Sequence, residues 1–246
     1  MRLQTATWPE VENYLTRSNG IIVPIGSTEQ HGPNGMLGTD AICPETIAFG
    51  VAGKMEVLIA PTLSIGQAHH HLGFPGTIAL RPSTLLAVLV DVVRSLYRQG
   101  FRHVYFLNGH GGNVATVTAA FQEIYAQSSF GDADLSDLRL KLSNWYMSPA
   151  VGRVSKELFG DQEGSHATPS EVSLTFYACP DAVKSAPMTP VIAPQGAIRD
   201  ADDYRAQFAD GRIGSNPALA SVAAGERLFE AGVTDVLEDF GKFLST

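Results

Sequence analysis

Short apolar runs alternate with amphipathic segments along this chain. The apolar runs predict four strands, at Gly20–Ile25, Val57–Leu63, His103–Leu107 and Leu138–Asn144. Between them, apolar residues recur every three or four positions, as on one face of a helix. The first strand is apolar throughout, as expected where both faces of a strand are covered. This alternation is typical of βα units around a largely parallel sheet.

Helix signals occur in four segments. Pro82–Gln99 opens with a proline in its first turn, and a glycine follows its last residue. Val114–Gln127 follows the third predicted strand after a short glycine-rich loop, and Pro169–Ala178 again starts with proline. Asn216–Ser245 is long enough for one or two further helices.

The remaining long polar stretches predict loops, and nothing predicts a second domain. Gly131–Asp137 is acidic and Pro187–Asp210 holds three prolines, so both are expected at the surface. The 246 residues contain no repeat, low-complexity tract or break in composition. We therefore expect one α/β domain spanning residues 1–246.

Charge and cysteine content narrow the classes of function. The chain has 17 basic and 25 acidic residues, a net charge of -8, and no basic cluster, which argues against nucleic acid as a partner. No apolar stretch approaches the roughly 18 residues of a membrane span, so no membrane partner is expected. The two cysteines, Cys43 and Cys179, suit a reducing compartment, and the N-terminus lacks the apolar core of a signal peptide. These features predict a cytoplasmic location.

The histidines are strongly clustered. Six of the seven lie in glycine- and carboxylate-rich segments, at Ser27–Asp40, Gly66–Thr77, Asn108–Asn113 and Glu163–Glu171. Histidine can bind transition metals and transfer protons near neutral pH. Three of these segments follow predicted strands, and open α/β sheets bind ligands at the carboxyl ends of their strands. The pattern predicts one metal-dependent hydrolytic site.

The first segment offers three candidate metal ligands. Glu29 and His31 are two residues apart, so in an extended segment they share a side while Gln30 faces away. Asp40 can fold back against them after a glycine-rich loop, and its two oxygens can bridge two cations. One histidine with two carboxylates suits Zn, Mn or Fe better than Ca or Mg. The alternative is a helix-capping carboxylate with a surface histidine.

The Asn-Gly-His-Gly-Gly-Asn segment offers His110. Its glycines allow the backbone to approach a ligand closely, which would push the imidazole forward at the end of a strand. The alternative is an anion-binding loop, because backbone N–H groups at a helix N-terminus bind phosphate. The Gly-Lys-Ser/Thr ending of a phosphate loop is absent, which favours a metal ligand.

The last segment supplies an acid–base candidate. Glu171 lies in the first turn of a predicted helix, where it either interacts favourably with the helix N-terminus or binds a metal. His166 lies in the preceding loop and is a candidate proton donor, and Glu163 is a further candidate for contact with substrate.

The consecutive histidines His69–His71 cannot all face one cavity. We expect His71 to reach the site while its neighbours pack or face water. The following Phe-Pro-Gly-Thr is expected to be a rigid turn in the pocket wall. His103, at the start of an apolar strand, is expected to be structural.

Taken together, these segments resemble the creatininase (creatinine amidohydrolase) family. The matching pieces occur in the family's order from residue 21 to about residue 180: Pro-Ile-Gly-Ser-Thr-Glu-Gln-His-Gly-Pro, Leu-Gly-Thr-Asp, Phe-Pro-Gly-Thr, Asn-Gly-His-Gly-Gly-Asn and a late His-Ala-x-x-x-Glu. The resemblance implies a three-layer αβα sandwich with a mostly parallel sheet. It also implies a two-metal centre and a homohexamer.

The resemblance further implies a ligand set. Glu29, Asp40 and His110 would surround one ion, and His31, a bridging Asp40 and a further carboxylate would hold the other. In creatininase that last carboxylate lies two residues after the histidine matching His110, where this chain has Gly112.

The Asn-Gly-His-Gly-Gly-Asn branch of the family suggests a substitute for the missing carboxylate. It carries a glutamate five residues after the second histidine, which makes Glu171 the expected ligand here. His166 matches the family's proton-shuttling histidine. The expected cofactors are two divalent ions, Zn and/or Mn, with Fe as an option.

Departures from the family pattern argue against creatinine as the substrate. Asn34–Met36 replaces the usual His-Leu-Pro, and Gln162 and Glu163 lie where creatininase carries a tryptophan. Trp145, at a predicted strand end, is expected to line the pocket instead.

The expected activity is hydrolysis of a C–N bond in a cyclic amide, a formamide or a related small molecule. A metal-activated hydroxide shared by both ions would attack, and the shuttle histidine would protonate the departing nitrogen. The alternatives are a catalytically idle metal-binding protein and a phosphate-ligand-binding protein.

Overall fold

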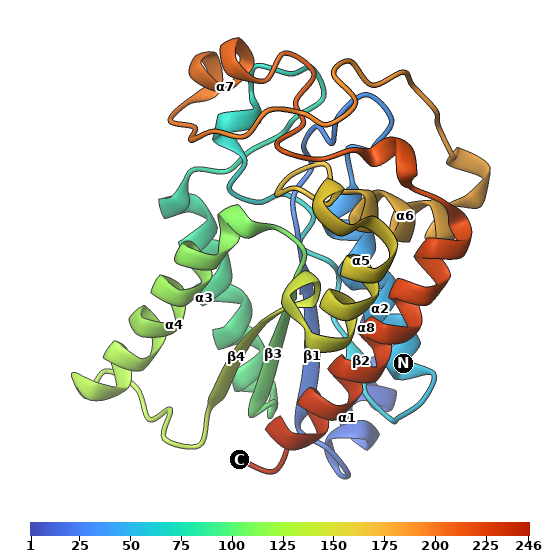
Figure 1. The fold of residues 1–246 in the computed structure, drawn as a ribbon. Helices are drawn as coiled ribbons and strands as arrows, with labels where there is room; N and C mark the ends of the chain where they lie inside the picture. The colour runs from blue at the N-terminus through green and yellow to red at the C-terminus, as the bar shows by residue number, and fades with distance from the viewer.

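A parallel four-stranded sheet forms the centre of the computed structural model, which describes residues 1–246 (Figure 1). The strand order is β2-β1-β3-β4, and all three neighbouring pairs are parallel. The strands are β1 (Gly20–Ile25), β2 (Leu58–Ile59), β3 (His103–Asn108) and β4 (Arg139–Asn144).

Helices cover both faces of this sheet (Figure 1). One face packs against α3 (Pro82–Gln99) and α4 (Val114–Ser129), with α1 (Trp8–Leu15) contributing at its edge. The other face packs against α2 (Thr39–Ala52), α5 (Pro149–Phe159), α6 (Pro169–Ala178) and α8 (Val222–Phe243). A short helix, α7 (Ala201–Gln207), lies above the sheet, and single 3-10 turns occur at Leu3–Thr5, His69–His71, Gly111–Asn113, Trp145–Met147, Gly160–Gln162, Pro180–Ala182 and Pro217–Leu219.

Alternating side chains of β1 divide the interior into two cores. Ile21, Val23 and Ile25 pack into the α3–α4 core, whereas Ile22 packs into the core formed by α2, α5, α6 and α8. This division follows from the two-residue period of a strand. The predicted three-layer αβα sandwich with a parallel sheet is confirmed. None of the helices is both long and apolar enough to cross a bilayer.

The second strand is shorter than predicted. The apolar run Val57–Leu63 forms a two-residue strand, and the chain then leaves the ladder near Pro61, which has no N–H to donate. Leu63 returns to β1 as an isolated bridge opposite Ile25.

The expectation that Pro187–Asp210 is loop throughout is wrong at α7. The Asp200 side chain accepts a hydrogen bond from the backbone N–H of Asp203 and caps this helix. Tyr204 is fully buried and contacts the 3-10 turn of the consecutive histidines through His70 and His71. Helices α1, α2 and α5 were likewise not predicted.

Two glycines bring the start of α2 against the edge of the sheet. Gly26 and Gly109 directly follow β1 and β3, and a Cβ atom at either position would overlap the backbone carbonyl of Asp40. Because neither has a side chain, the first turn of α2 can pack directly onto these two strand ends. Asp40 is thereby placed where the loops after β1 and β3 meet.

Candidate functional site

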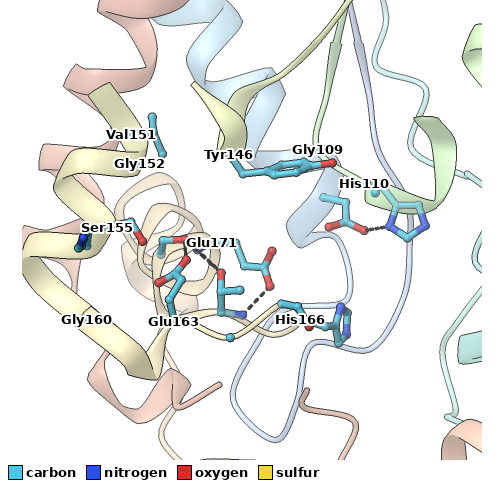
Figure 2. A pocket seen from close by; sticks show the side chains of 17 residues that line it. Gly109, His110, Tyr146, Val151, Gly152, Ser155, Gly160, Glu163, His166 and Glu171 are labelled. Atoms are coloured by element: carbon cyan, nitrogen blue, oxygen red, sulfur yellow. Dashed lines mark hydrogen bonds and ion pairs between the residues drawn. The ribbon is translucent and has the colours of Figure 1, made fainter. Parts of the chain in front are cut away.

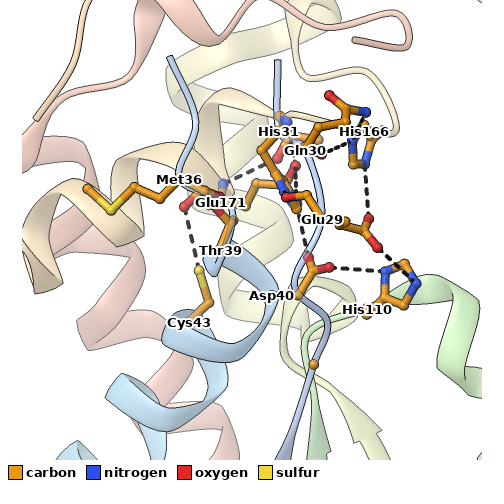
Figure 3. Close-up of polar contacts among 12 residues, drawn as sticks. Glu29, Gln30, His31, Met36, Thr39, Asp40, Cys43, His110, His166 and Glu171 are labelled. Atoms are coloured by element: carbon orange, nitrogen blue, oxygen red, sulfur yellow. Dashed lines mark hydrogen bonds and ion pairs between the residues drawn. The ribbon is translucent and has the colours of Figure 1, made fainter. Parts of the chain in front are cut away.

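Five titratable side chains converge at this edge of the sheet (Figure 3). They come from the loop after β1, the first turn of α2, the loop after β3 and the first turn of α6: Glu29, His31, Asp40, His110 and Glu171. The first four are at most 5% exposed. The structure thus brings together every residue that the sequence suggested as a metal ligand.

Asp40 lies between two histidines. Its Oδ1 is 3.1 Å from Nε2 of His31, and its Oδ2 is 3.1 Å from Nδ1 of His110. Farther out, Oε2 of Glu29 is 3.3 Å from Nε2 of His110, and Oε1 of Glu171 is 3.9 Å from Nε2 of His31. Carboxylates and imidazoles therefore alternate along the site, with Asp40 at its centre.

Backbone carbonyls orient both imidazoles. Nδ1 of His31 donates to the carbonyl of Glu29 at 3.2 Å, and Nε2 of His110 donates to the carbonyl of Gln67 at 3.0 Å. The remaining nitrogen of each ring therefore faces Asp40. Metal-binding histidines are commonly fixed in this way by a hydrogen bond from the other ring nitrogen.

The electrostatics of the site favour cations. Burial acts to lower the pKa of His31, but the Asp40 carboxylate, with Glu171 and Glu29, raises it to about 10. Burial is likewise outweighed at His110, where Glu29 and Asp40 raise the pKa to about 9. Despite burial, His31 and His110 hold the pKa of Asp40 well below its usual range. A divalent cation can replace the protons held here.

The donor set fits a transition metal. Both carboxylate oxygens of Glu29 and Oδ2 of Asp40 are buried without a hydrogen-bond donor. Buried carboxylate oxygens are costly unless a cation or donor compensates them. Ligand atoms of Glu29, His31 and Asp40 lie within 4.8 Å of one another, as do those of His31, His166 and Glu171. Imidazole nitrogens with carboxylate oxygens suit Zn, Mn and Fe.

Glu171 combines both roles considered for it. Its Oε1 accepts a hydrogen bond from the backbone N–H of Thr168 at 2.6 Å, and the Thr168 hydroxyl accepts one from the backbone N–H of Glu171, which is a capping box. The same oxygen faces His31. Burial raises the pKa of Glu171 to about 7, because it disfavours the charged carboxylate, and a bound cation would offset this cost.

His166 lies beside the ligands and lines the cavity. Its Nε2 donates to the backbone carbonyl of Gln30 at 2.8 Å, so the lone pair of Nδ1 faces the site, 3.9 Å from Oε1 of Glu29. Burial lowers the pKa of His166 well below its usual value. The next residue, Ala167, has φ of 52°, a left-handed conformation that non-glycine residues adopt at a cost and that occurs often near functional sites.

A polar cavity of about 510 Å³ opens onto these groups. Asp40, His110, His166 and Glu171 line one side, and α5 with the loop before α6 lines the other (Figure 2). Tyr146 and Val151 are its only two hydrophobic lining residues. Such a lining suits a ligand rich in hydrogen-bonding groups.

Glu163 lies on the far side of this cavity. One of its carboxylate oxygens accepts a hydrogen bond from the hydroxyl of Ser170, while its buried Oε2 has no donor. Burial also raises the pKa of Glu163.

Trp145 is placed differently from expectation, whereas His71 reaches the site from behind Glu29. Trp145 does not line the cavity: it is 1% exposed and packs into the core formed by α2, α5, α6 and α8. It opens a 3-10 turn that directs the following Tyr146 toward the cavity instead. His71 reaches Glu29, with Nε2 3.0 Å from Oε1, but it lies behind the carboxylate and outside the cavity lining.

Sequence reasoning missed Tyr146 and Gln30. The tyrosine carried no motif, and Gln30 was expected to face away from the site. Its side chain does point away from Asp40, but it contacts ring nitrogens of His71 and His166 at 2.9 Å each. Only its position between Glu29 and His31 could have indicated this role.

A phosphate ligand does not match this charge pattern. His110 turns toward two carboxylates, and Glu171 adds a third. These groups would repel a phosphate at the loop after β3.

A buried histidine–carboxylate cluster at the strand ends of an αβα sandwich can hold a divalent metal. The chain belongs to the creatininase family: the family model described as "Creatininase: Creatinine amidohydrolase" matches residues 4–240.

Curated relatives carry different activities. A creatinine amidohydrolase of Pseudomonas putida is 28% identical, over 95% of this chain and 94% of its own. A mycofactocin precursor peptide peptidase of Mycobacterium tuberculosis is 27% identical, over 92% and 86%. A 3-dehydro-scyllo-inosose hydrolase of Thermotoga maritima is 37% identical over 109 residues, so the match spans 44% of this chain but only 35% of that relative.

Solved structures share the fold. A manganese creatininase superposes with a TM-score of 0.83 at 24% identity, covering 98% of this chain and 97% of its own. A mutant creatininase of Zn-Zn type gives a TM-score of 0.82 with the same identity and coverage.

Proposed function

We propose that the protein is a metal-dependent amidohydrolase that cleaves a C–N bond in a cyclic amide, a formamide or a related small molecule. The observation that carries this proposal is the position of Asp40, whose two oxygens each face a ring nitrogen of a different histidine at 3.1 Å. A carboxylate in this position can serve two cations at once. The proposed cofactors are therefore two divalent ions, Zn and/or Mn, with Fe as an option.

The proposed ligands divide into two sets that share Asp40. Glu29 and His110 complete one set, and His31 and Glu171 complete the other. When bound, two such cations lower the pKa of water from about 15.7 toward 7 and polarise the substrate carbonyl. The protein supplies fixed ring orientations and a buried environment for this chemistry.

His166 is the proposed proton shuttle. Its Nε2–H is held by the Gln30 carbonyl, so Nδ1 is free to accept a proton from the attacking water. The same nitrogen then returns the proton to the departing nitrogen of the substrate. The ring remains in place throughout because Nε2 keeps its hydrogen bond.

The cavity chemistry supports a small polar substrate. Glu163 lines this cavity and is proposed to contact the substrate. Tyr146, not Trp145, supplies the aromatic wall. Beyond the site itself, we propose one domain, a homohexamer and a cytoplasmic location, on the family resemblance and composition.

Elemental analysis tests the proposal first. We expect two metal ions per wild-type chain after incubation with Zn or Mn, and one in Glu171→Ala. Wild type with one ion or none would remove the binuclear mechanism and favour a catalytically idle family member. A panel of formamides, cyclic amides and short peptides then tests the substrate class, and cleavage confined to peptides would contradict the small-molecule proposal.

A further inference from the structure

We infer that Gln30 is a positioning residue that fixes both a metal ligand, Glu29, and the proton shuttle, His166. The assignment of Glu29 as a metal ligand and of His166 as the proton shuttle rests on the proposed function. The hydrogen bonds that define the arrangement do not, because each follows from donor and acceptor chemistry within the loop after β1 and its neighbours.

A contact with the backbone sets the orientation of the Gln30 amide. Its Oε1 accepts a hydrogen bond from the backbone N–H of Gly32 at 2.9 Å. A backbone N–H can only donate, so the amide oxygen must lie on this side. Nε2 therefore faces Nδ1 of His71 and the backbone carbonyl of Gly211, both at 2.9 Å.

This orientation fixes the tautomer of His71. Because the Gln30 amide donates to Nδ1, the proton of the neutral ring lies on Nε2. That nitrogen lies 3.0 Å from Oε1 of Glu29, so its proton is on the side of this carboxylate. In this arrangement His71 acts on Glu29 as a close polar neighbour. The chain of contacts runs from Gln30 through His71 to Glu29.

The backbone of Gln30 acts on the other side. Its carbonyl accepts the Nε2–H of His166 at 2.8 Å. Tyr204 closes the arrangement by donating to the Gly211 carbonyl at 2.7 Å. Gln30 is 5% exposed, so water cannot readily replace these contacts. One residue therefore sets the direction of both Glu29 and the free nitrogen of His166.

The first test uses metal affinity. Gln30→Met keeps the length of the side chain but removes its hydrogen bonds. We expect it to weaken one of the two bound Zn ions about 10- to 100-fold, the usual effect of losing a partner that orients a ligand, and to leave the other ion unchanged. His71→Phe should weaken the same ion. The double variant should lose little more Zn affinity than either single variant, because both substitutions act on Glu29. Competition with a chromophoric chelator measures these affinities.

Asn34→Ala is the matched control. Asn34 is a buried amide in the same loop, but its side chain donates to the carbonyl of Pro217, away from the site. It should lower thermal stability without changing either metal affinity. Equal loss of metal in this variant would reduce Gln30 to a structural role.

The second test is independent of metal. Long-range ¹H–¹⁵N spectra of the metal-free protein should show the Nε2–H tautomer at His71. Gln30→Glu keeps the shape but replaces the donor with an acceptor, so the His71 proton should move to Nδ1. An unchanged tautomer would overturn the inference. If Gln30→Glu reverses the tautomer as expected but the wild-type protein binds no metal, only the proposed function is overturned.

Discussion

Among single residues, the protonation of His31 and His110 decides how the centre binds cations. Each ring is fixed at one nitrogen by a backbone carbonyl and faces Asp40 with the other. In the metal-free protein, carboxylates hold protons on both rings well above the ordinary histidine pKa of about 6.5. The same carboxylates attract a divalent ion, so protons and metal compete for one set of atoms.

This competition predicts a pH dependence of metal affinity. The pKa values are about 10 for His31 and about 9 for His110, so both rings are protonated below pH 9. Each ion must displace a proton, and the Kd for Zn should fall up to about tenfold per pH unit from pH 6 to 8 for each proton displaced. Calorimetry in buffers of different ionisation enthalpy should detect the released protons. A Kd independent of pH would contradict the assigned ligands.

Without metal, the same groups predict the opposite trend in stability. Both pKa values are raised above that of unfolded histidine, so the contribution is fully present below about pH 6.5 and is lost as pH rises through 9 to 10. The thermal midpoint of the chelated protein should therefore fall between pH 7 and 10. In the metal-loaded protein the rings are neutral ligands, so its thermal midpoint should not fall over this pH range.

His166 supports a separate prediction on turnover. His166→Ala should retain both ions, because the proposed ligands remain, but should lose about 10²- to 10⁴-fold in kcat, the usual contribution of a positioned acid–base group. His103→Ala is the control, since His103 lies at the other end of β3 and bonds to Asn19. Loss of metal from His166→Ala would make His166 a ligand instead.

Among the elements, those with proline or strand signals could be predicted, and those that depend on tertiary contacts could not. The bounds of α3, α6 and β1 agree with the residues that the pattern indicated. Helix α2 was hidden because its apolar residues are distributed around its circumference and a proline lies inside it. Helix α7 is held by the burial of one tyrosine, which no local pattern reveals.

The candidate ligands could be predicted because each lies in a glycine-rich strand-end loop or at a helix start. Gly112, where creatininase has a carboxylate, is explained only by the structure: a Cβ there would overlap Nε2 of His110. The loop after β3 therefore excludes a side chain at this position. The contacts of the Gln30 amide with His71 and Gly211, and the position of Tyr146 in the cavity wall, depend on residues distant in sequence, so spacing alone could not predict them.

The packing of α2 on the strand ends gives a prediction for Gly109. Gly109→Ala would drive a methyl group into the Asp40 carbonyl, which must shift. We expect a loss of about 1–3 kcal/mol in the free energy of unfolding, as for other overpacked sites, and at least one metal ion lost per chain. Gly241→Ala, on open α8 surface, should keep both ions and stabilise the helix slightly. Full metal content in Gly109→Ala would show that Asp40 is not fixed by this contact.

Across the whole molecule, the site ties together segments far apart in the chain. Its ligands span residues 29 to 171, and α6 and α2 belong to one outer layer while the loops after β1 and β3 leave the sheet. Bound ions would therefore connect two of the three layers. A metal that binds only the folded chain must stabilise it by mass action.

Metal removal should accordingly lower thermal stability. At a free Zn concentration of 100 times Kd, each site should add about 2.7 kcal/mol to the free energy of unfolding, which corresponds to roughly 5–10 °C in a chain of this size. Chelation should remove this gain, and Zn or Mn should restore it. Mg should restore little, because it prefers oxygen ligands and two of the five proposed ligands are histidines. Glu171→Ala should keep about half of the gain, since one ligand set remains complete. If Zn does not change the thermal midpoint of the wild-type protein, the chain has no preformed metal centre, whatever its substrate.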